Sequence, residues 1–526
     1  MASPVFYMND RANSLPESLK FKAVKVFRDA GLGELFKPGD TVGVKIHMGE
    51  YGNTMNLRPQ MIRSIVEEIK KLKGKPVVVD CTTIAFNEYT SRGTKEDMLW
   101  TAARHGMTEE TLSCPIWVCD GDYGLDDVKV EIPHGTFLKH TYMGKQLKDL
   151  DAMIVVTHFK GHPMGVFGGA MKNVGIGCGS KRGKLCTHLL NHPDYGRLAW
   201  TVNPKAVEAA QQGEKPSVLD RFISNCPFGA PSVKDGVFQT DTDRCHQCAS
   251  CFGPALFSGI LAPPPEIMRF WAITIPDAFS GYVHAIGKNK VGYVTYGIDI
   301  TPWCDCVNFH DRQLVPNMGV FASKDPVAID MACLEMAEAS AGMPGSKADD
   351  FGFGDPGTER FTNLSSMATV SQWAQIHSGI YNGLGTSEYE LITSKPAPEF
   401  DFWMPKYSPE KPWGLVNRKG LHGGEWKPEY PYTHDRPKIS LAEASLKPKG
   451  KASERELQAG DRLAAQAASR ESREPRKRNG GNDERRICRK DALCGPQQGH
   501  HRDSGANGRP GQEFHRWLRH RGPGTL

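Results

Sequence analysis

Short, nearly continuous apolar runs alternate with amphipathic segments along most of the chain, and this alternation constrains the fold more than any other feature. Runs with the length and valine content of buried strands lie at 41–49, 75–83, 114–120 and 150–159. Residues 59–74 carry apolar side chains at helical spacing, opened by Pro59 and closed by Gly74. The alternation predicts an α/β fold, with parallel-type sheets covered by helices.

The same pattern returns after residue 290. Residues 291–300 and 315–323 are typical of strands, and 325–340 of a helix with Asp325 at its N-cap. Beyond about residue 385 the chain is rich in Pro, Trp and Lys without clear periodicity, which predicts irregular structure. We therefore expect five parts: an N-terminal α/β domain with a glycine-rich loop (1–221), a cysteine-rich ferredoxin-like insert (222–262), an α/β continuation (263–400), an irregular surface wrap (401–450) and a basic disordered tail (451–526).

Basic residues are concentrated at the C-terminal end. Residues 451–526 hold 17 Lys and Arg against 10 Asp and Glu, whereas the whole chain has a net charge of +5. The preceding part is therefore close to neutral, which gives no support to a folded body that binds nucleic acid. The low apolar content of the tail predicts disorder.

No segment of the sequence is typical of a membrane span or a secretory signal. A spanning helix needs about 20 nearly uninterrupted apolar residues, and the chain has no such run. The first twenty residues include Asp10, Arg11 and Glu17. We expect a soluble, cytoplasmic protein, in which the 14 cysteines are reduced and clustered cysteines ligate metal or act in catalysis.

Three cysteines form a Cys-x2-Cys-x2-Cys motif, at Cys245, Cys248 and Cys251. Three thiolates on one tight loop suit an iron–sulfur cluster. Zinc is the main rival, because closely spaced thiolates also form tetrahedral sites. For the isolated cysteines we expect a packing role: Cys81, Cys114, Cys119 and Cys333.

The sequence leaves the fourth cluster ligand open. Where the bacterial ferredoxin pattern has its next cysteine, this chain has Ala255. Cys226, which precedes a proline in the same segment, is the expected substitute, and Cys304 and Cys306 are alternatives. The choice between a 4Fe-4S and a 3Fe-4S cluster stays open.

A glycine-rich segment runs from His158 to His188. Glycine at this density lets a ligand approach backbone N–H groups closely. Gly168 and Gly169 precede a stretch that can start a helix, and its N–H groups, together with an exposed Lys172, could bind a small anion. The alternative is a packing turn without a ligand.

Candidate catalytic residues follow from the predicted sheet. Ligand groups of parallel sheets gather after the carboxyl ends of strands, where this chain has His47 and His158. We expect His47, His158, His162 and Lys172 to converge beneath the glycine-rich loop, with the last three in catalytic roles.

Several ordered motifs resemble the family called domain of unknown function 362, over roughly residues 1–400: VGVKIHMGEYGN, NLRP, HFKGHPMGVFGGAMKNVGIG, DITPWCDC and GVFASKDPVAIDMA. The resemblance implies an uncharacterised iron–sulfur centre protein with a ferredoxin-like insert. It also implies that Cys245, Cys248 and Cys251 are the first three cluster ligands, while Ala255 departs from the pattern.

The Gly-Gly-Ala-Met-Lys stretch with its flanking histidines is similar, more distantly, to the lactate racemase family. That resemblance implies a nickel-pincer nucleotide held by Lys172, a nickel ligand at His188 and an acid/base at His162. Chance spacing in a glycine-rich loop is the simpler account.

These features predict an iron–sulfur redox enzyme or electron carrier, with a redox partner protein and a small anionic ligand at the glycine-rich loop. One alternative is a metal-dependent racemase- or isomerase-like enzyme with a structural cluster. Another is a non-enzymatic cluster scaffold or sensor. The sequence does not indicate the oligomeric state.

Overall fold

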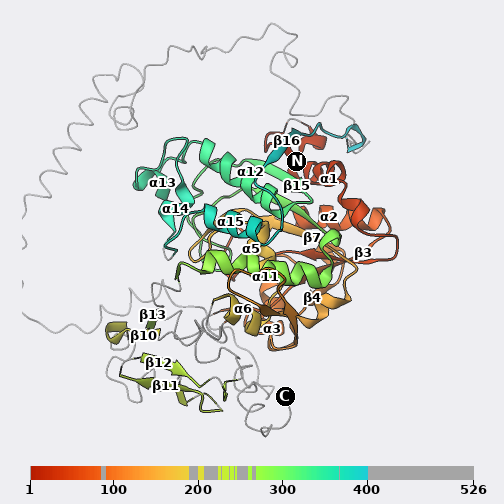
Figure 1. The fold of residues 1–526 in the computed structure, drawn as a ribbon. Helices are drawn as coiled ribbons and strands as arrows, with labels where there is room; N and C mark the ends of the chain where they lie inside the picture. The colour runs from red at the N-terminus through yellow and green to blue at the C-terminus, as the bar shows by residue number, and fades with distance from the viewer. Residues whose placement is uncertain are drawn as a thin grey trace, which may run out of the picture. The chain divides into compact units, whose positions relative to one another are not determined.

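The computed structural model describes residues 2–400, except 13, 85–89, 189–199, 207–222, 225, 227, 236, 242, 246–258, 263–267 and 366–367. An eight-stranded sheet in the order β16-β1-β15-β14-β7-β2-β3-β4 forms its centre (Figure 1). Its strands are β1 (Ser3–Met8), β2 (Thr41–Lys45), β3 (Lys75–Asp80), β4 (Ile116–Val118), β7 (Ala152–His158), β14 (Val291–Gly297), β15 (Gly319–Ser323) and β16 (Tyr389–Thr393).

Helices cover both faces of this sheet. One group is α1 (Leu19–Asp29), α2 (Pro59–Lys71), α3 (Lys95–Arg104) and α4 (Glu109–Leu112). The other is α5 (Ala170–Gly175), α6 (Lys181–Thr187), α11 (Trp271–Ile286), α12 (Pro326–Ala339), α13 (Lys347–Asp350), α14 (Arg360–Leu364) and α15 (Trp373–Tyr381). Alternate residues of β3 belong to different hydrophobic clusters: Val78 lies with Ile62 of α2, and Val79 with Met171 of α5. The predicted α/β class is confirmed.

Local sequence signals explain where the elements begin. The Asp325 side chain accepts hydrogen bonds of 2.9 Å from the N–H groups of Val327 and Ala328, and Pro326 takes the first position of α12. All six strands expected from the apolar runs are present, as β2, β3, β4, β7, β14 and β15.

Three features differ from the sequence expectations. Most neighbouring strands of the sheet are parallel, but β15 is antiparallel to both β1 and β14. No helix crosses over between β14 and β15, so the chain returns in the opposite direction. Irregular structure was expected after residue 385, and this was wrong for β16, an edge strand of the sheet that pairs with β1. The helix α11, which contains Pro276, was not predicted.

Smaller sheets lie outside the central one. The pairs β5 (Asp127–Glu131) with β6 (His140–Gly144) and β8 (Lys160–His162) with β9 (Val166–Gly168) are antiparallel. A four-stranded sheet joins β11 (Pro231–Lys234), β12 (Val237–Thr240), β10 (Trp200–Val202) and β13 (Leu261–Ala262). One of its strands, β10, precedes residue 222, where the cysteine-rich insert is expected to begin. The expected domain bounds stay predictions. The expectations for 401–450 and 451–526 fall outside the described residues.

Within the part of the chain that the structure describes, no helix is both long enough and apolar enough to cross a membrane.

The connection order reverses between β2 and β7, which are neighbours in the sheet. From β2 the chain continues outward to β3 and β4, whereas β7 continues on the other side to β14. In open α/β sheets such a reversal leaves a crevice outside the carboxyl ends of the strands, where ligands bind. The loops after β2, β3, β7 and β14 all reach this edge.

Candidate functional site

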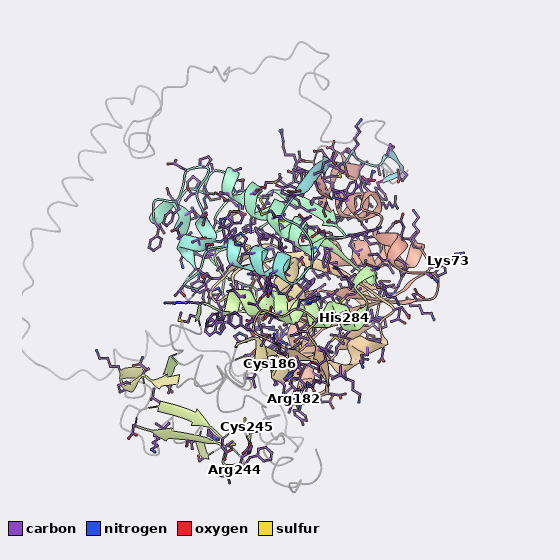
Figure 2. All side chains as sticks on the ribbon, in the orientation of Figure 1. Lys73, Arg182, Cys186, Arg244, Cys245 and His284 are labelled. Atoms are coloured by element: carbon purple, nitrogen blue, oxygen red, sulfur yellow. The ribbon has the colours of Figure 1, made fainter. Side chains whose placement is uncertain are left out.

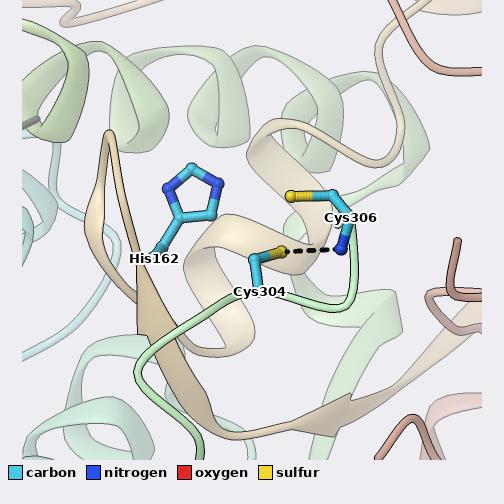
Figure 3. A group of neighbouring side chains, drawn as sticks. All are labelled: His162, Cys304 and Cys306. Atoms are coloured by element: carbon cyan, nitrogen blue, oxygen red, sulfur yellow. Dashed lines mark hydrogen bonds between the residues drawn. The ribbon is translucent and has the colours of Figure 1, made fainter. Parts of the chain in front are cut away.

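The loop after β14 brings two cysteines, Cys304 and Cys306, to the carboxyl ends of the parallel strands, where the connection order reverses. Cys304 is fully buried and Cys306 half-buried. The backbone N–H of Cys306 donates to Cys304 Sγ over 3.4 Å, which folds the short loop around this sulfur (Figure 3). From the sequence, both cysteines were named as alternative cluster ligands.

Three of the predicted residues, His47, His162 and Lys172, meet at Cys304. Lys172 Nζ lies 3.1 Å from Cys304 Sγ. A ring nitrogen of His162 lies within 4.8 Å of the same sulfur, and the His47 ring is near enough to interact with its charge. His47 comes from the loop after β2, His162 from β8 and Lys172 from α5. The predicted convergence of these three side chains is present in the structure, whereas the expectation of an exposed Lys172 was wrong, because its side chain is buried.

Backbone groups determine which nitrogen of each imidazole carries the proton. The N–H of Gly49 donates to His47 Nδ1 over 2.9 Å, and the N–H of Gly165 donates to His162 Nδ1 over 2.8 Å. A backbone N–H cannot accept, so Nδ1 of a neutral ring must be the acceptor and Nε2 must carry the hydrogen. In their neutral form both histidines are therefore Nε2–H donors.

The surrounding donors make Cys304 and Cys306 chemically different. Burial raises the pKa of Cys304, but the hydrogen bond from Cys306, the charge of Lys172 and the two histidine hydrogen bonds hold it well below its ordinary value. The hydrogen bond to Cys304 and burial raise the pKa of Cys306 well above its ordinary value. These opposite shifts favour the thiolate form at Cys304 and the thiol form at Cys306, and thiolates are the nucleophilic form of cysteine.

The histidines near this thiolate stay neutral at physiological pH. Burial lowers the pKa of His47 to about 4. Burial and the charge of Lys172 also lower the pKa of His162. For Lys172, burial lowers the pKa, but the charges of Cys304 and Cys306 and a hydrogen bond to Cys304 raise it above its ordinary value. The ion pair at the centre of the site is therefore Lys172 with Cys304.

His158, expected to be catalytic, lies behind the cysteine loop. Its Nδ1 is 3.0 Å from both carboxylate oxygens of Asp305, and its Nε2 is 2.8 Å from the carbonyl oxygen of Ile298. Both ring nitrogens of His158 thus face acceptor oxygens. Lys160 Nζ binds the same carboxylate over 2.8 Å. The contacts of His158 hold Asp305 in place, and Asp305 is the residue between the two cysteines.

A second set of buried charges supports the loop from the other side. The N–H of Glu50 donates to the carbonyl oxygen of Asp305 over 2.7 Å. The Glu50 carboxylate is paired with Arg92 over 3.0 Å, with both side chains buried. Removing one partner of such a pair leaves an uncompensated buried charge. Sequence reasoning missed Asp305, Lys160, Glu50 and Arg92, because the contacts that define them join distant segments.

The glycines of the glycine-rich loop contact protein groups. Gly169 is the N-cap of α5, and the first two N–H groups of this helix, from Ala170 and Met171, donate to Asp330 over 2.6 and 3.0 Å. A Cβ atom at Gly169 would lie 2.3 Å from a carboxylate oxygen of Asp330. The group that occupies this helix start is thus the carboxyl of Asp330 on α12, whose pKa burial raises to about 7. Ligand binding at Gly168 and Gly169 stays a prediction.

His188 lies at the end of α6, next to the same buried region. Its Nδ1 is 2.5 Å from the carbonyl oxygen of Lys184, and its ring meets Trp271 edge to face at 5.8 Å between centroids. Burial lowers the pKa of His188 to about 4, and His162 and Lys172 are among the charges that lower it further. Its role as a ligand stays a prediction.

Ligand atoms of His162, Cys304 and Cys306 all lie within 4.8 Å of one another and could hold a metal ion. Thiolates and imidazole suit zinc, iron or nickel. A metal-bound imidazole usually donates the proton of its other nitrogen to an acceptor. Nδ1 of His162 instead accepts a backbone hydrogen bond, so the proton of the neutral ring is on Nε2. Metal binding through Nε2 would therefore require this nitrogen to lose its proton.

The residues of the predicted cluster are only partly described. Cys226 and Cys245 are half-buried, and Cys245 lies next to Arg244 (Figure 2). Cys248 and Cys251 fall outside the described residues. The cluster assignment stays a prediction. The isolated Cys81, Cys114, Cys119 and Cys333 are buried, as expected for packing residues.

Fold and site together define an α/β protein with a buried cysteine–histidine centre at the point where its strand order reverses. A family model described as Domain of unknown function (DUF362) matches residues 42–335, so the chain belongs to that family. The matched range includes the glycine-rich loop, the cysteine-rich segment and the Cys304–Cys306 loop.

No curated protein matches the chain. Among solved structures, the chain is similar to the lactate racemase apoprotein from Thermoanaerobacterium thermosaccharolyticum, with 12% identity and a TM-score of 0.27. The alignment covers 56% of this chain and 51% of that one, so it spans about half the length of the racemase.

Proposed function

We propose that this chain is an oxidoreductase whose reacting groups are the Cys304 thiolate and the Cys306 thiol. The observation that carries the proposal is the buried ammonium of Lys172, 3.1 Å from Cys304 Sγ, with the His47 and His162 rings beside the same sulfur. A purely packing cysteine does not need a buried ammonium and two oriented imidazoles.

The chemistry of the pair is dithiol–disulfide exchange. On oxidation, the S–H bond of Cys306 breaks and a bond forms between Cys304 Sγ and Cys306 Sγ. Two electrons pass to an acceptor disulfide, whose S–S bond breaks. The proton released by Cys306 is taken up by one of its sulfurs, so the acceptor leaves as one thiol and one thiolate. The two sulfurs are already within 4.8 Å of each other. Lys172 and the histidines stabilise the negative charge that Cys304 carries in the reduced state.

We also propose an iron–sulfur cluster held by Cys245, Cys248 and Cys251, with Cys226 as fourth ligand. The spacing of the three cysteines supports it. Such a cluster supplies one-electron transfer when bound, and a redox partner protein would then be required. The donor set that holds Cys304 is independent of this cluster.

A second candidate is a metal-dependent enzyme, in which His162, Cys304 and Cys306 bind one transition-metal ion and leave a position open for substrate. The mutual distances of these ligand atoms favour it. The racemase-like form of this idea assigns Lys172 to a nucleotide cofactor, whereas its ammonium is paired with Cys304 in the structure.

One set of variants separates these proposals. The full chain is purified without oxygen, equilibrated in glutathione buffers of graded potential, and analysed for disulfide by mass spectrometry and for iron, sulfide, zinc and nickel. The wild type should form a Cys304–Cys306 disulfide. Cys306→Ser should not form it and should keep its iron, whereas Cys248→Ser should lose iron and sulfide.

Cys114→Ser is the matched control, because Cys114 is buried and belongs to neither site. Absence of the disulfide at every potential would reject the dithiol proposal. A single metal ion lost from both His162→Ala and Cys306→Ser would support the metal-dependent enzyme instead. A covalent nucleotide on Lys172, seen in the peptide mass, would favour its racemase-like form.

A further inference from the structure

A cavity lies at the end of the central sheet opposite the cysteines, where β14 begins and β15 ends. Its volume is about 430 Å³, and it is lined by residues from the start of β14, the end of α11 and the segments that precede α12 and follow α15. Since β14 and β15 are antiparallel, the start of β14 lies beside the end of β15, with Tyr293 opposite Ser323. The Cys304 loop follows the other end of β14. The two sites are therefore separated by the length of this strand.

The rim of this cavity is basic. Its lining residues include His134, His284, Lys288 and Lys324 and no aspartate or glutamate. Lys288 Nζ donates to the carbonyl oxygen of Gly383 over 2.6 Å, and no ion pair of Lys288 is present among the described residues. Lys324 is the member of the rim with a carboxylate partner, Glu34 at 2.9 Å. A rim of this kind attracts anions.

Tyr293 supplies a polar group to the interior of the cavity. The residue is 2% exposed and lines the cavity, and its hydroxyl has no hydrogen-bond partner among the described residues. Buried tyrosine hydroxyl groups usually find a partner. Burial raises the pKa of Tyr293 well above its ordinary value, so the hydroxyl remains protonated and can donate.

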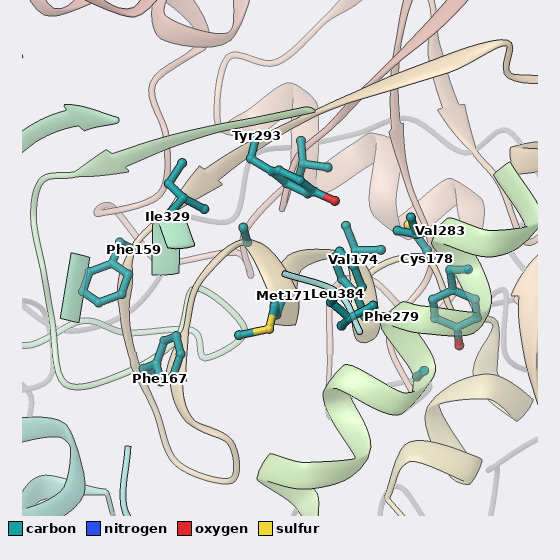
Figure 4. Close-up of a cluster of buried hydrophobic side chains, with 14 of the residues drawn as sticks. Phe159, Phe167, Met171, Val174, Cys178, Phe279, Val283, Tyr293, Ile329 and Leu384 are labelled. Atoms are coloured by element: carbon teal, nitrogen blue, oxygen red, sulfur yellow. The ribbon is translucent and has the colours of Figure 1, made fainter. Parts of the chain in front are cut away.

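Apolar side chains form the walls around this hydroxyl. Phe279, Val283 and Leu384 lie near Tyr293 in the buried cluster, and the Phe279 and Tyr293 rings are 6.1 Å apart between centroids (Figure 4). The volume is within the range of small-molecule sites. An apolar wall, one free O–H donor and a cationic rim match a ligand that has an apolar body and an anionic head.

We propose that this cavity binds a small organic anion, a carboxylate or phosphate attached to an apolar body, with the anionic head bound by the Tyr293 hydroxyl and the basic rim. The proposal is independent of the cysteine chemistry. The two head groups share the same acceptor oxygens, and binding experiments with each distinguish them.

The test uses isothermal titration calorimetry on the full chain with phenyl phosphate and benzoate as probes. Benzyl alcohol, of similar size but uncharged, is the ligand control. One of the two anions should bind saturably, and benzyl alcohol should not. Tyr293→Phe keeps the ring and removes the donor, so it should weaken binding about tenfold or more. Lys288→Met should weaken binding in the same direction.

Tyr296→Phe is the matched protein control. Tyr296 belongs to the same strand and is equally buried, but it faces the other side of the sheet, where its hydroxyl donates to the carbonyl oxygen of Met61 over 3.3 Å. This variant should bind the probe as the wild type does. The proposal is overturned if neither anion binds, or if Tyr293→Phe binds with wild-type affinity while remaining folded by circular dichroism.

Discussion

At the scale of single residues, the site depends on which atoms face Cys304. The sequence analysis predicted that His47, His162 and Lys172 would meet, because residues after parallel strands share one edge of the sheet. It could not show that they meet at a cysteine about 130 residues further along the chain than Lys172. Nor could it show that Lys172 is buried, since a lysine after glycines is more often exposed.

Lys172→Met should raise the pKa of Cys304. The substitution keeps most of the side-chain volume and removes the ammonium that stabilises the thiolate. We expect the ultraviolet absorbance of this thiolate to appear at a higher pH than in the wild type. Lys71→Met, on the surface of α2, is the control and should leave the titration unchanged. Identical titrations of the wild type and Lys172→Met would contradict this role of Lys172.

His188→Gln should make the protein less sensitive to acid. The folded pKa of His188 is about 4, below its ordinary value of 6.5, so the unfolded chain binds more protons between these values. The free energy of unfolding therefore falls as the pH drops through this window. Urea unfolding near pH 7 and near pH 5 should show a smaller loss for His188→Gln than for the wild type. An equal loss would mean that another group controls this window.

At the scale of elements, tertiary contacts determine strand directions and helices that the apolar pattern of the sequence does not predict. The pattern located six strands of the central sheet, since buried strands need continuous apolar runs. It did not determine the direction of β15, which depends on the connection from β14. It also missed α11, because Pro276 and Gly281 are unfavourable inside helices and tertiary packing overrides that preference.

Gly169→Ala should destabilise the start of α5. The added Cβ would lie 2.3 Å from the Asp330 carboxylate, which holds the first N–H groups of this helix. Overpacking of this kind costs about 1–3 kcal/mol. Gly354→Ala is the control, because a Cβ there meets no atom within 4 Å. Chemical denaturation should show a clear loss in the free energy of unfolding for Gly169→Ala only. Equal stability of the two variants would show that α5 and Asp330 move apart without cost.

At the scale of the whole molecule, the family and the fold class agree with the sequence analysis, but the expected cluster does not follow from them. The family match and the α/β sheet confirm that the order of the motifs is informative. The cluster depends on Cys248 and Cys251, which lie outside the described residues, and on chemistry that spacing alone does not determine.

Removing residues 451–526 should leave the melting temperature within about 2 °C of the full chain, since this segment has no periodic apolar face to pack against a core. Differential scanning calorimetry of the two forms measures this directly. A larger decrease would show that the segment contributes to the folded structure.

The central claim is that Cys304 is a thiolate near neutral pH, held by Lys172 and two neutral histidines. The most direct test is the ultraviolet thiolate absorbance of the reduced, metal-free protein as a function of pH, for the wild type and Cys304→Ser. The difference between them should show one thiolate that is already ionised well below the ordinary cysteine pKa of about 8.5. If the difference appears only at or above that pH, Cys304 is an ordinary buried thiol and the proposed redox site is wrong.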